Sequence, residues 1–473
     1  MRPDYLGRMS LLALAAVTSG VVALGSADVT FGAALVGETR QVAVEQKAAP
    51  GTDKLKALYR RPAAIPFPKD NPYTPEKAAL GKKLYFDTRL SVTSAQSCGS
   101  CHSPSFGWGD GLAVGVGHGM QKLGRHTPTV INAAWSDIFM WDGRLPTLED
   151  QALGPIQSTG EMNMPLDELM ARLKSVPEYK PLFDRVFPQE GITPKTLAKA
   201  IATYERTMVS ERAPFDAWIE GDEKAISEPA KRGFVLFNSK AQCAACHEGW
   251  NFTNEGFQDI GLPSDDVGRG KFVPGVVKMQ HAFKTPSLRE IGHRLPYMHD
   301  GSLATLEQVV EHYDSGGVDR ASRSDLMHPL GLTAQEKSDL VAFLKTIDSP
   351  PDPDRRTDPA TLKEFCTMRM SVILSLVVLA GLSTGALAAT QVIHQQGRAF
   401  SSESITVKKG EAVTFLNDDT VPHNIMSASK GNEFNLGSLP PGSSTDVTFK
   451  DDGDVQVICA IHPRMKMTVK VVD

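Results

Sequence analysis

Two short cysteine motifs constrain this chain more than any other feature of its sequence. Each has the form Cys-x-x-Cys-His: CGSCH occupies residues 98–102, and CAACH occupies residues 243–247. Two thiols at this spacing can add to the two vinyl groups of a haem, and the adjacent histidine can ligate the iron from one side. The sequence therefore predicts two covalently bound haems c, held by Cys98, Cys101 and His102 and by Cys243, Cys246 and His247.

The same cysteine spacing also occurs in redox disulfides and as half of a zinc site. Neither explains why a histidine follows both motifs in a chain with only 12 histidines. Helical periodicity in segments such as LAKAIATYERTMV and TAQEKSDLVAFLKTI alternates with loops rich in Gly and Pro. This pattern predicts two mostly α-helical cytochrome c-like domains, one over residues 53–215 and one over residues 216–350.

Composition limits the classes of partner. The chain has 473 residues, of which 41% are hydrophobic, so it can build several globular cores. Its formal net charge is −5, and the lysines and arginines are spread along the sequence. This distribution argues against nucleic acid as a partner.

A different pattern occupies residues 390–473, where apolar and polar residues alternate between turns rich in Gly, Asp and Pro. Such alternation, with many β-branched residues, predicts an antiparallel Greek-key β-sandwich. Two imidazoles, one thiolate and a weak axial thioether form a type I copper site, and the candidates are His423, Cys459, His462 and Met465. Met467 is less suitable than Met465 because it lies two positions farther along the chain. The order of these residues resembles the amicyanin and plastocyanin group of cupredoxins.

Two apolar segments have the form of secretory signal peptides. The first lies within residues 1–36 and predicts export to the periplasm, with a membrane anchor if it stays uncut. The second covers residues 368–389, after a linker at 351–367 that holds an unpaired Cys366. A membrane span there would return the copper domain to the cytoplasm, so we interpret the segment as the signal peptide of a second exported precursor joined to the first.

Several runs in the helical region resemble one family in order. They include CGSCHSPSFGWGDG, GRHTPTVINAAW, FMWDGRLPTLEDQALGPIQSTGEM and FKTPSLREIGHRLPYMHDGSLATLEQVVEHYDSGG. Over most of residues 53–350 the chain resembles the bacterial di-haem cytochrome c peroxidase and MauG family. In that family the N-terminal haem reacts with peroxide and the C-terminal haem transfers electrons. The resemblance implies that His102 ligates the peroxide-reacting haem and that His247 ligates the electron-transfer haem.

The resemblance also implies residues for the peroxide chemistry. Trp141 matches the family tryptophan between the haems, while Gln151 and Glu161 match the polar pair beside the peroxide-reacting haem. A carboxylate such as Glu161 can move a proton between the two oxygens of peroxide, and Gln151 can hold peroxide by hydrogen bonds. Without the resemblance, Glu161 is better interpreted as an exposed residue or as a first-turn acid of the helix predicted for MPLDELMARL.

Two further positions distinguish the branches of the family. His118, in GVGHGMQ, matches the histidine that ligates the peroxide-reacting haem of oxidised peroxidases. Tyr313, in LEQVVEHYDSGG, matches the tyrosine that MauG carries as second ligand of the electron-transfer haem, in place of the usual Met. Met298 and Met327 are rival ligands at that haem.

The family binds one calcium ion between the haems, through an Asn side chain and backbone carbonyl oxygens. His126 stands at the Asn position in this chain. Because a hard cation prefers oxygen ligands, this difference weakens the expectation of calcium, which we retain as a candidate cofactor.

Three functions are open from the sequence. The favoured one is a peroxidase that reduces hydrogen peroxide to water. Its electrons would come from a small redox protein, either the attached cupredoxin or an external cytochrome or cupredoxin, and would pass through the haem at His247. A MauG-like enzyme that oxidises a protein substrate is the first alternative, which Tyr313 favours. A non-catalytic electron-transfer protein is the second.

Overall fold

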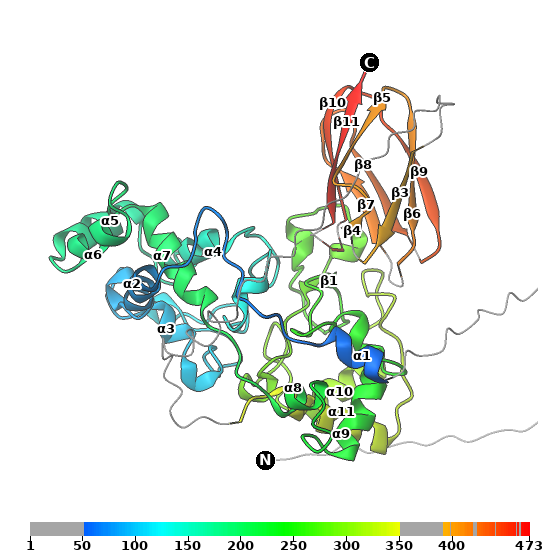
Figure 1. The fold of residues 1–473 in the computed structure, drawn as a ribbon, viewed down its shortest axis with the longest axis horizontal. Coiled ribbons are helices and arrows are strands. Elements are labelled where there is room, and N and C mark those ends of the chain that lie inside the picture. The colour runs from blue at the N-terminus through cyan, green and yellow to red at the C-terminus, as the bar shows by residue number, and fades with distance from the viewer. Residues whose placement is uncertain are drawn as a thin grey trace, which may run out of the picture. The chain divides into compact units, whose positions relative to one another are not determined.

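The computed structural model describes residues 52–350 and, apart from short gaps at 398, 420–422, 440, 460 and 463–464, residues 391–473 (Figure 1). The predicted signal or anchor at 1–36, the linker at 351–367 with Cys366, and the apolar segment at 368–389 lie outside these residues. Within the described ranges, no helix has both the length and the apolar character needed to cross a membrane.

The first helical domain contains α2 (Pro75–Tyr85), α3 (Cys98–Cys101), α4 (Leu148–Gln157), α5 (Leu166–Ser175), α6 (Tyr179–Val186) and α7 (Pro194–Arg206). Thr74 and Thr193 cap α2 and α7, and each is followed by a proline at the first helical position. The two helices cross at Gly81, where a Cβ atom would lie 1.9 Å from the carbonyl oxygen of Ala200. Only glycine permits this close approach.

The second helical domain contains α8 (Pro214–Ile219), α9 (Glu228–Phe237), α10 (Leu306–Ser315) and α11 (Ala334–Leu344). It repeats the close crossing, because a Cβ atom on Gly233 of α9 would lie 2.0 Å from the carbonyl oxygen of Asp339 on α11. Its core also takes in the start of the described chain, since α1 (Thr52–Leu58) contributes Leu55, and Tyr59 packs beside it. The sequence did not indicate that this segment packs in the second core.

A two-stranded ribbon extends the second helical domain. It is formed by β1 (Phe257–Gln258) and β2 (Phe283–Lys284), which pair antiparallel. The chain between them contains two short 3-10 turns, η6 (Arg269–Lys271) and η7 (Val277–Met279). Among these residues Phe257, Val276 and Met279 are buried.

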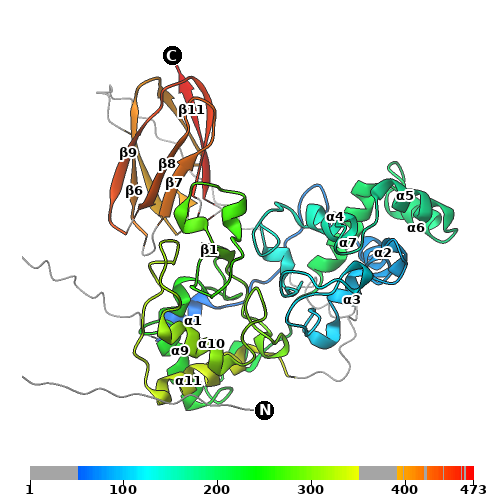
Figure 2. The same ribbon diagram turned by 180° about the vertical axis from the view of Figure 1, so that it is seen from behind.

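The C-terminal region is a sandwich of two sheets (Figures 1 and 2). One sheet has the order β5-β11-β10-β7-β8 and the other β4-β3-β6-β9. The strands are β3 (Gln391–Gln396), β4 (Ala399–Phe400), β5 (Ser404–Lys408), β6 (Ala412–Asn417), β7 (His423–Ser427), β8 (Phe434–Leu439), β9 (Ser444–Thr448), β10 (Gly453–Ile458) and β11 (Lys466–Val472). Buried positions alternate along β6 and β11, so apolar side chains meet between the sheets. The architecture confirms the predicted fold class: paired helical cytochrome c-like domains followed by an all-β cupredoxin.

Candidate haem and copper sites

The first cysteine motif lies on α3, and His102 follows directly after this short helix. Nδ1 of His102 lies 3.2 Å from the carbonyl oxygen of Trp108. A carbonyl only accepts, so Nδ1 must carry the proton and Nε2 remains available for a metal. Burial lowers the pKa of His102, which keeps the imidazole neutral, as an iron ligand must be.

The second motif repeats this arrangement. Nδ1 of His247 lies 3.0 Å from the carbonyl oxygen of Phe252, which again leaves Nε2 available. Burial lowers the pKa of His247 to about 4. Both donor sets therefore fit a haem with one protein imidazole on its iron; the covalent links through the four cysteines remain a prediction.

Glu161 lies in the turn between α4 and α5. Helix α5 begins only at Leu166, and its first-turn acids are Asp167 and Glu168. The interpretation of Glu161 as a first-turn acid is therefore wrong, because the helix starts later than the sequence pattern indicates. Burial, together with smaller contributions from the carboxylates of Asp110 and Glu161, raises the pKa of the Cys101 thiol to about 11. Glu161 is thus close enough to the first motif for the two groups to interact electrostatically.

The loop that carries His118 lies against the Glu161 turn. The amide of His118 donates to the carbonyl oxygen of Gly160 at 3.0 Å, and a Cβ atom on Gly117 would lie 3.0 Å from Cα of Glu161. Nδ1 of His118 is buried and has no hydrogen-bond partner among the described residues. Buried polar atoms without partners are uncommon, and this nitrogen fits the predicted role of an iron ligand. Gln151 lies half-buried on α4, the helix that leads into this turn.

Trp141 lies where the two helical domains meet. Its indole Nε1 donates to the carbonyl oxygen of His126 at 2.8 Å, and its own carbonyl accepts from the amide of Lys284 at 2.8 Å. The ring of His299 is 6.4 Å away, centroid to centroid. Trp141 thus contacts both helical domains, and its predicted role between two haems agrees with this position.

His126 occupies the position expected to carry a calcium ligand. Its Nδ1 lies 2.7 Å from the carbonyl oxygen of Leu112, and its amide donates to the carbonyl oxygen of His299 at 2.7 Å. The imidazole already holds a backbone oxygen and offers nitrogen rather than oxygen. This side chain does not fit a calcium ligand, so we assign calcium no role.

Tyr313 lies on α10 beside the second motif. Burial raises the pKa of its phenol well above the usual range, and Cys246 and Cys243 raise it further. The phenol is thus within electrostatic reach of both cysteines that would attach the second haem. Met298 is partly buried in the core of the second helical domain, and Met327 is buried; neither rival is excluded by its position.

The predicted copper ligands gather at one end of the sandwich. His423 opens β7, Cys459 follows β10 directly, and Met465 precedes β11, with His462 in the loop between the last two. Nδ1 of His423 and Nδ1 of His462 lie 3.0 Å apart, and Sγ of Cys459 is 3.9 Å and 3.7 Å from them. All three residues are buried, as is Met465. Two imidazole nitrogens converging with one sulfur fit a type I copper centre.

Burial and nearby polar groups set the electrostatic environment of these candidate ligands. Burial raises the pKa of the Cys459 thiol to about 11, while backbone amides of Asn424 and His462 point at its sulfur from 3.3 Å and 3.4 Å. Copper binding must therefore displace the thiol proton, and the two amides then stabilise the thiolate. Asp419 lies 3.2 Å from Nε2 of His423 and fixes its orientation, a contact that sequence reasoning missed although the NDDTVPH segment contains it.

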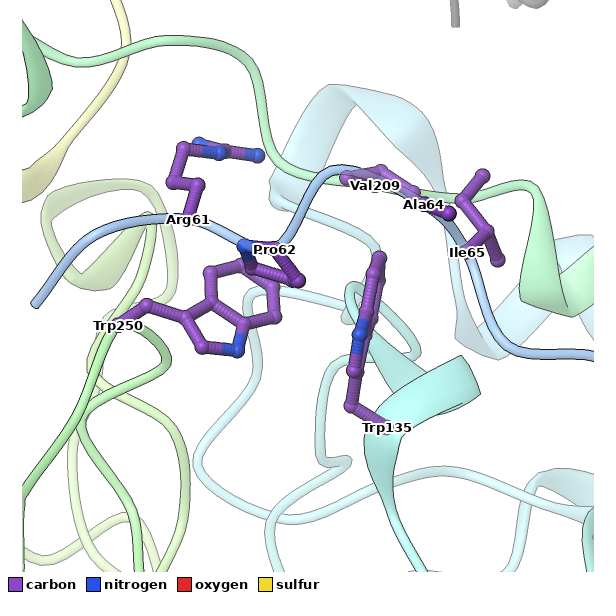
Figure 3. Close-up of a pocket in the computed structure, with 7 residues that line it drawn as sticks. All are labelled: Arg61, Pro62, Ala64, Ile65, Trp135, Val209 and Trp250. Atoms are coloured by element: carbon purple, nitrogen blue, oxygen red, sulfur yellow. The ribbon is translucent and has the colours of Figure 1, made fainter. Parts of the chain in front are cut away.

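A small pocket lies between the segment at residues 61–65 and two tryptophans (Figure 3). Trp135 and Trp250 meet edge to face with ring centroids 4.7 Å apart, and the guanidinium of Arg61 lies 5.4 Å from the ring of Trp250. None of the lining residues is a predicted ligand or a predicted catalytic residue. We therefore assign the pocket no part in either site.

Comparisons with known proteins agree with this division of the chain. A family model described as di-haem cytochrome c peroxidase matches residues 75–224, and a cytochrome c model matches residues 230–348. A model for copper-binding proteins of the plastocyanin/azurin family matches residues 388–472. Together these matches identify haem-binding cytochrome c domains and a copper-binding cupredoxin domain.

Relatives are found in both branches. The chain is 53% identical over 300 residues to the methylamine utilization protein MauG of Methylorubrum extorquens, covering 63% of this chain and 85% of that protein. It is 35% identical over 270 residues to the cytochrome c551 peroxidase of Pseudomonas aeruginosa, covering 54% and 78%. Among solved structures, a MauG-like protein associated with microbial copper homeostasis matches with a TM-score of 0.57 and 32% identity, covering 62% of this chain and 94% of that one.

Proposed function

Because the chain belongs to the di-haem cytochrome c peroxidase and MauG family and also carries a cupredoxin domain, we propose that it reduces hydrogen peroxide to water in the periplasm with electrons from its own copper domain. Each peroxide takes up two electrons and two protons and gives two water molecules. The electrons enter the second helical domain and reach the first by way of the Trp141 region. Membership of this family makes the protein an oxidoreductase, whether it reduces peroxide to water or oxidises a protein substrate.

The haem held by Cys98, Cys101 and His102 would supply the iron at which the O–O bond of peroxide breaks. The side chains around it manage protons and position. The carboxylate of Glu161 would take a proton from one peroxide oxygen and return it to the other, so that the departing oxygen leaves as water. The amide of Gln151 would hold the peroxide by hydrogen bonds, and the glycine-flanked His118 would move aside to admit it.

The choice of electron donor depends on one contact with the second helical domain. It is made by the loop that carries Cys459, His462 and Met465, which we call the copper loop. The amide of Phe257 donates to the carbonyl oxygen of Ile461 at 3.0 Å, and Ile461 is next to the copper-ligand candidate His462. An attached donor that touches the electron-transfer domain acts at a very high effective concentration. This supports the cupredoxin, rather than an external protein, as the donor.

A second candidate function is supported by two other observations. Tyr313 lies beside the second motif, and the identity to the MauG protein of M. extorquens is 53%. A phenolate ligand stabilises oxidised iron far better than a thioether does. The chain would then retain the oxidising equivalents of peroxide and use them to oxidise a protein substrate, with no need of the copper donor.

Steady-state peroxide consumption under a small-molecule reductant separates these functions. We expect continuous consumption by the copper- and haem-loaded chain and at least tenfold slower consumption by the Cys459→Ser variant, which lacks the copper thiolate. Equal rates would contradict electron supply through copper. Failure of both proteins to turn over peroxide, together with peroxide-dependent oxidation of an added protein substrate, would favour the second candidate.

A further inference from the structure

The copper loop rests on a surface of the second helical domain that is shaped for it. A Cβ atom added to Gly256 would lie 3.1 Å from the carbonyl oxygen of Ile461 and 3.3 Å from Cδ2 of His462. Gly256 precedes Phe257, whose amide bonds the same carbonyl oxygen. The glycine therefore allows the imidazole of a copper-ligand candidate to lie directly on the backbone of the other domain.

Apolar side chains surround this contact on both sides. Phe257, Val276, Met279 and Ala282 from the second helical domain form one buried cluster with Cys459, Ile461 and Met465 of the cupredoxin. Met279 is 1% exposed and Val276 is 8% exposed, although both lie on the loop between β1 and β2. A cluster of this kind excludes water from the space between the two domains, which stabilises the contact.

On its other side, Gly256 is connected to the second cysteine motif. The amide of Gly256 donates to Oδ1 of Asn254 at 2.7 Å. Asn254 in turn donates from its own amide to the carbonyl oxygen of Cys246 at 2.9 Å, and from Nδ2 to the carbonyl oxygen of Ala245 at 3.1 Å. A short chain of hydrogen bonds and van der Waals contact thus joins His462 to the residue that would attach the second haem.

We propose that Gly256 and Asn254 form the electron-entry route of this chain, from His462 through Gly256 and Asn254 to Cys246. This route rests on the proposed function, for which it gives the path. With copper and haem bound, each electron on this route would convert one Cu(I) to Cu(II) and one ferric haem iron to the ferrous state. No atom is transferred. The rate of electron tunnelling falls steeply as the gap between non-bonded groups widens. A side chain at position 256 that separates His462 from the backbone of the second helical domain should therefore slow the electron transfer.

The test is the rate of electron transfer from copper to haem in the full, loaded chain without peroxide. Flash-generated reductant reduces the copper, and the haem bands report when the electron arrives. We expect Gly256→Val to slow this step at least tenfold. The matched control is Gly124→Val, since nothing lies within 4 Å of a Cβ atom there, and we expect no change in rate. Val276→Asp breaks the apolar cluster without touching the route and is expected to slow the step as well.

Hydrogen exchange at the Phe257 amide gives a second readout that does not depend on either cofactor's activity. The bond to Ile461 predicts slow exchange in the parent chain and at least tenfold faster exchange in Gly256→Val and Val276→Asp. An unchanged electron-transfer rate in both variants would overturn the route, and so would fast exchange at Phe257 in the parent chain. Because no peroxide is present, these results stand whether or not the chain proves to be a peroxidase.

Discussion

The first and second helical domains hold their cysteine motifs in the same way but place different groups around them. Each has two helices that cross at a glycine, Gly81 in one and Gly233 in the other. Each turns Nδ1 of its motif histidine toward a backbone carbonyl oxygen, that of Trp108 or of Phe252. These shared features would position a haem in each domain. The residues that differ around the two motifs must therefore determine the chemistry of each haem.

Those differences divide the chemistry between the domains. Glu161 and the buried Nδ1 of His118, which has no partner among the described residues, lie near the first motif, and their proposed roles are proton carrier and movable ligand. Near the second motif the notable group is Tyr313, a buried phenol of raised pKa for which the role of haem ligand is proposed. The second domain also bears the contact with Ile461 of the copper loop. These observations support the proposal that peroxide reacts in the first domain and that electrons enter through the second.

The largest effect is expected from Glu161→Gln. If only the first domain handles peroxide protons, this change removes the proton carrier and lowers the rate of peroxide turnover by about 10² to 10⁴-fold. Stopped-flow mixing of the loaded protein with peroxide measures the rate. The control is Glu168→Gln, an exposed acid in the first turn of α5, which should leave the rate unchanged. A Glu161→Gln protein with parental turnover would remove the acid–base assignment.

The buried acids Glu205 on α7 and Asp339 on α11 should have opposite effects on how the free energy of unfolding changes with pH. Oε2 of Glu205 on α7 has no partner among the described residues, and burial raises the pKa of this carboxyl from 4.5 to about 8. Between these values the folded chain holds a proton that the unfolded chain has lost, so stability falls as pH rises through that window. Glu205→Gln should therefore leave the free energy of unfolding unchanged below pH 4.5 and raise it by about 3 to 5 kcal/mol above pH 8.

Asp339 on α11 is the matched acid of the second domain. Its carboxylate accepts two hydrogen bonds from Arg232, which holds its pKa below the usual value. A lowered pKa contributes stability above the unfolded value and loses it as pH falls, so Asp339→Asn should destabilise the chain near neutral pH. Urea unfolding at pH 4.5 and pH 8.5 measures both variants. A Glu205→Gln protein less stable than the parent at pH 8.5 would mean that another group neutralises the carboxylate.

The two helix crossings should be equally sensitive to a methyl group added at their glycines. A methyl group in Gly81→Ala or Gly233→Ala meets a backbone carbonyl oxygen of the facing helix, so the helices must separate, at a cost of about 2 to 3 kcal/mol in the free energy of unfolding. Thermal unfolding followed in the haem bands checks this, with Gly124→Ala as control. If the domains are independent repeats, each variant perturbs one haem spectrum; perturbation of both by either change would show that the crossings are coupled.

The smallest expected effect is that of Tyr313→Phe, which would remove the proposed ligand of the second haem without altering the fold. The spectrum of one haem should change to that of a five-coordinate or methionine-ligated iron, while the other haem keeps its spectrum. Resonance Raman spectroscopy on the ferric protein detects a phenolate ligand directly. Tyr297→Phe, in the same domain, is the control. An identical spectrum in Tyr313→Phe would identify Met298 or Met327 as the ligand.

The sequence predicted what depends on short-range spacing. Cys98, Cys101 and His102 lie within one turn, and Cys459 and His462 within one loop, so spacing alone predicts haem attachment at the first group and copper binding at the second. The fold class followed from helical and alternating periodicity. What the sequence could not show depends on long-range packing. The position of Glu161 in a turn depends on where α5 begins. Leu55 packs in a core formed mostly of residues far along the chain. The position of His462 depends on the second helical domain, against which it packs.

The central claim is that the first domain reduces peroxide with electrons from the attached copper. Its most direct test is stopped-flow mixing of fully reduced, copper- and haem-loaded protein with a small amount of hydrogen peroxide, following the blue thiolate-to-copper band and the haem bands together. The account predicts that the blue band appears in step with haem reoxidation and that two electrons leave per peroxide. Haems that become oxidised while the copper stays colourless would contradict it.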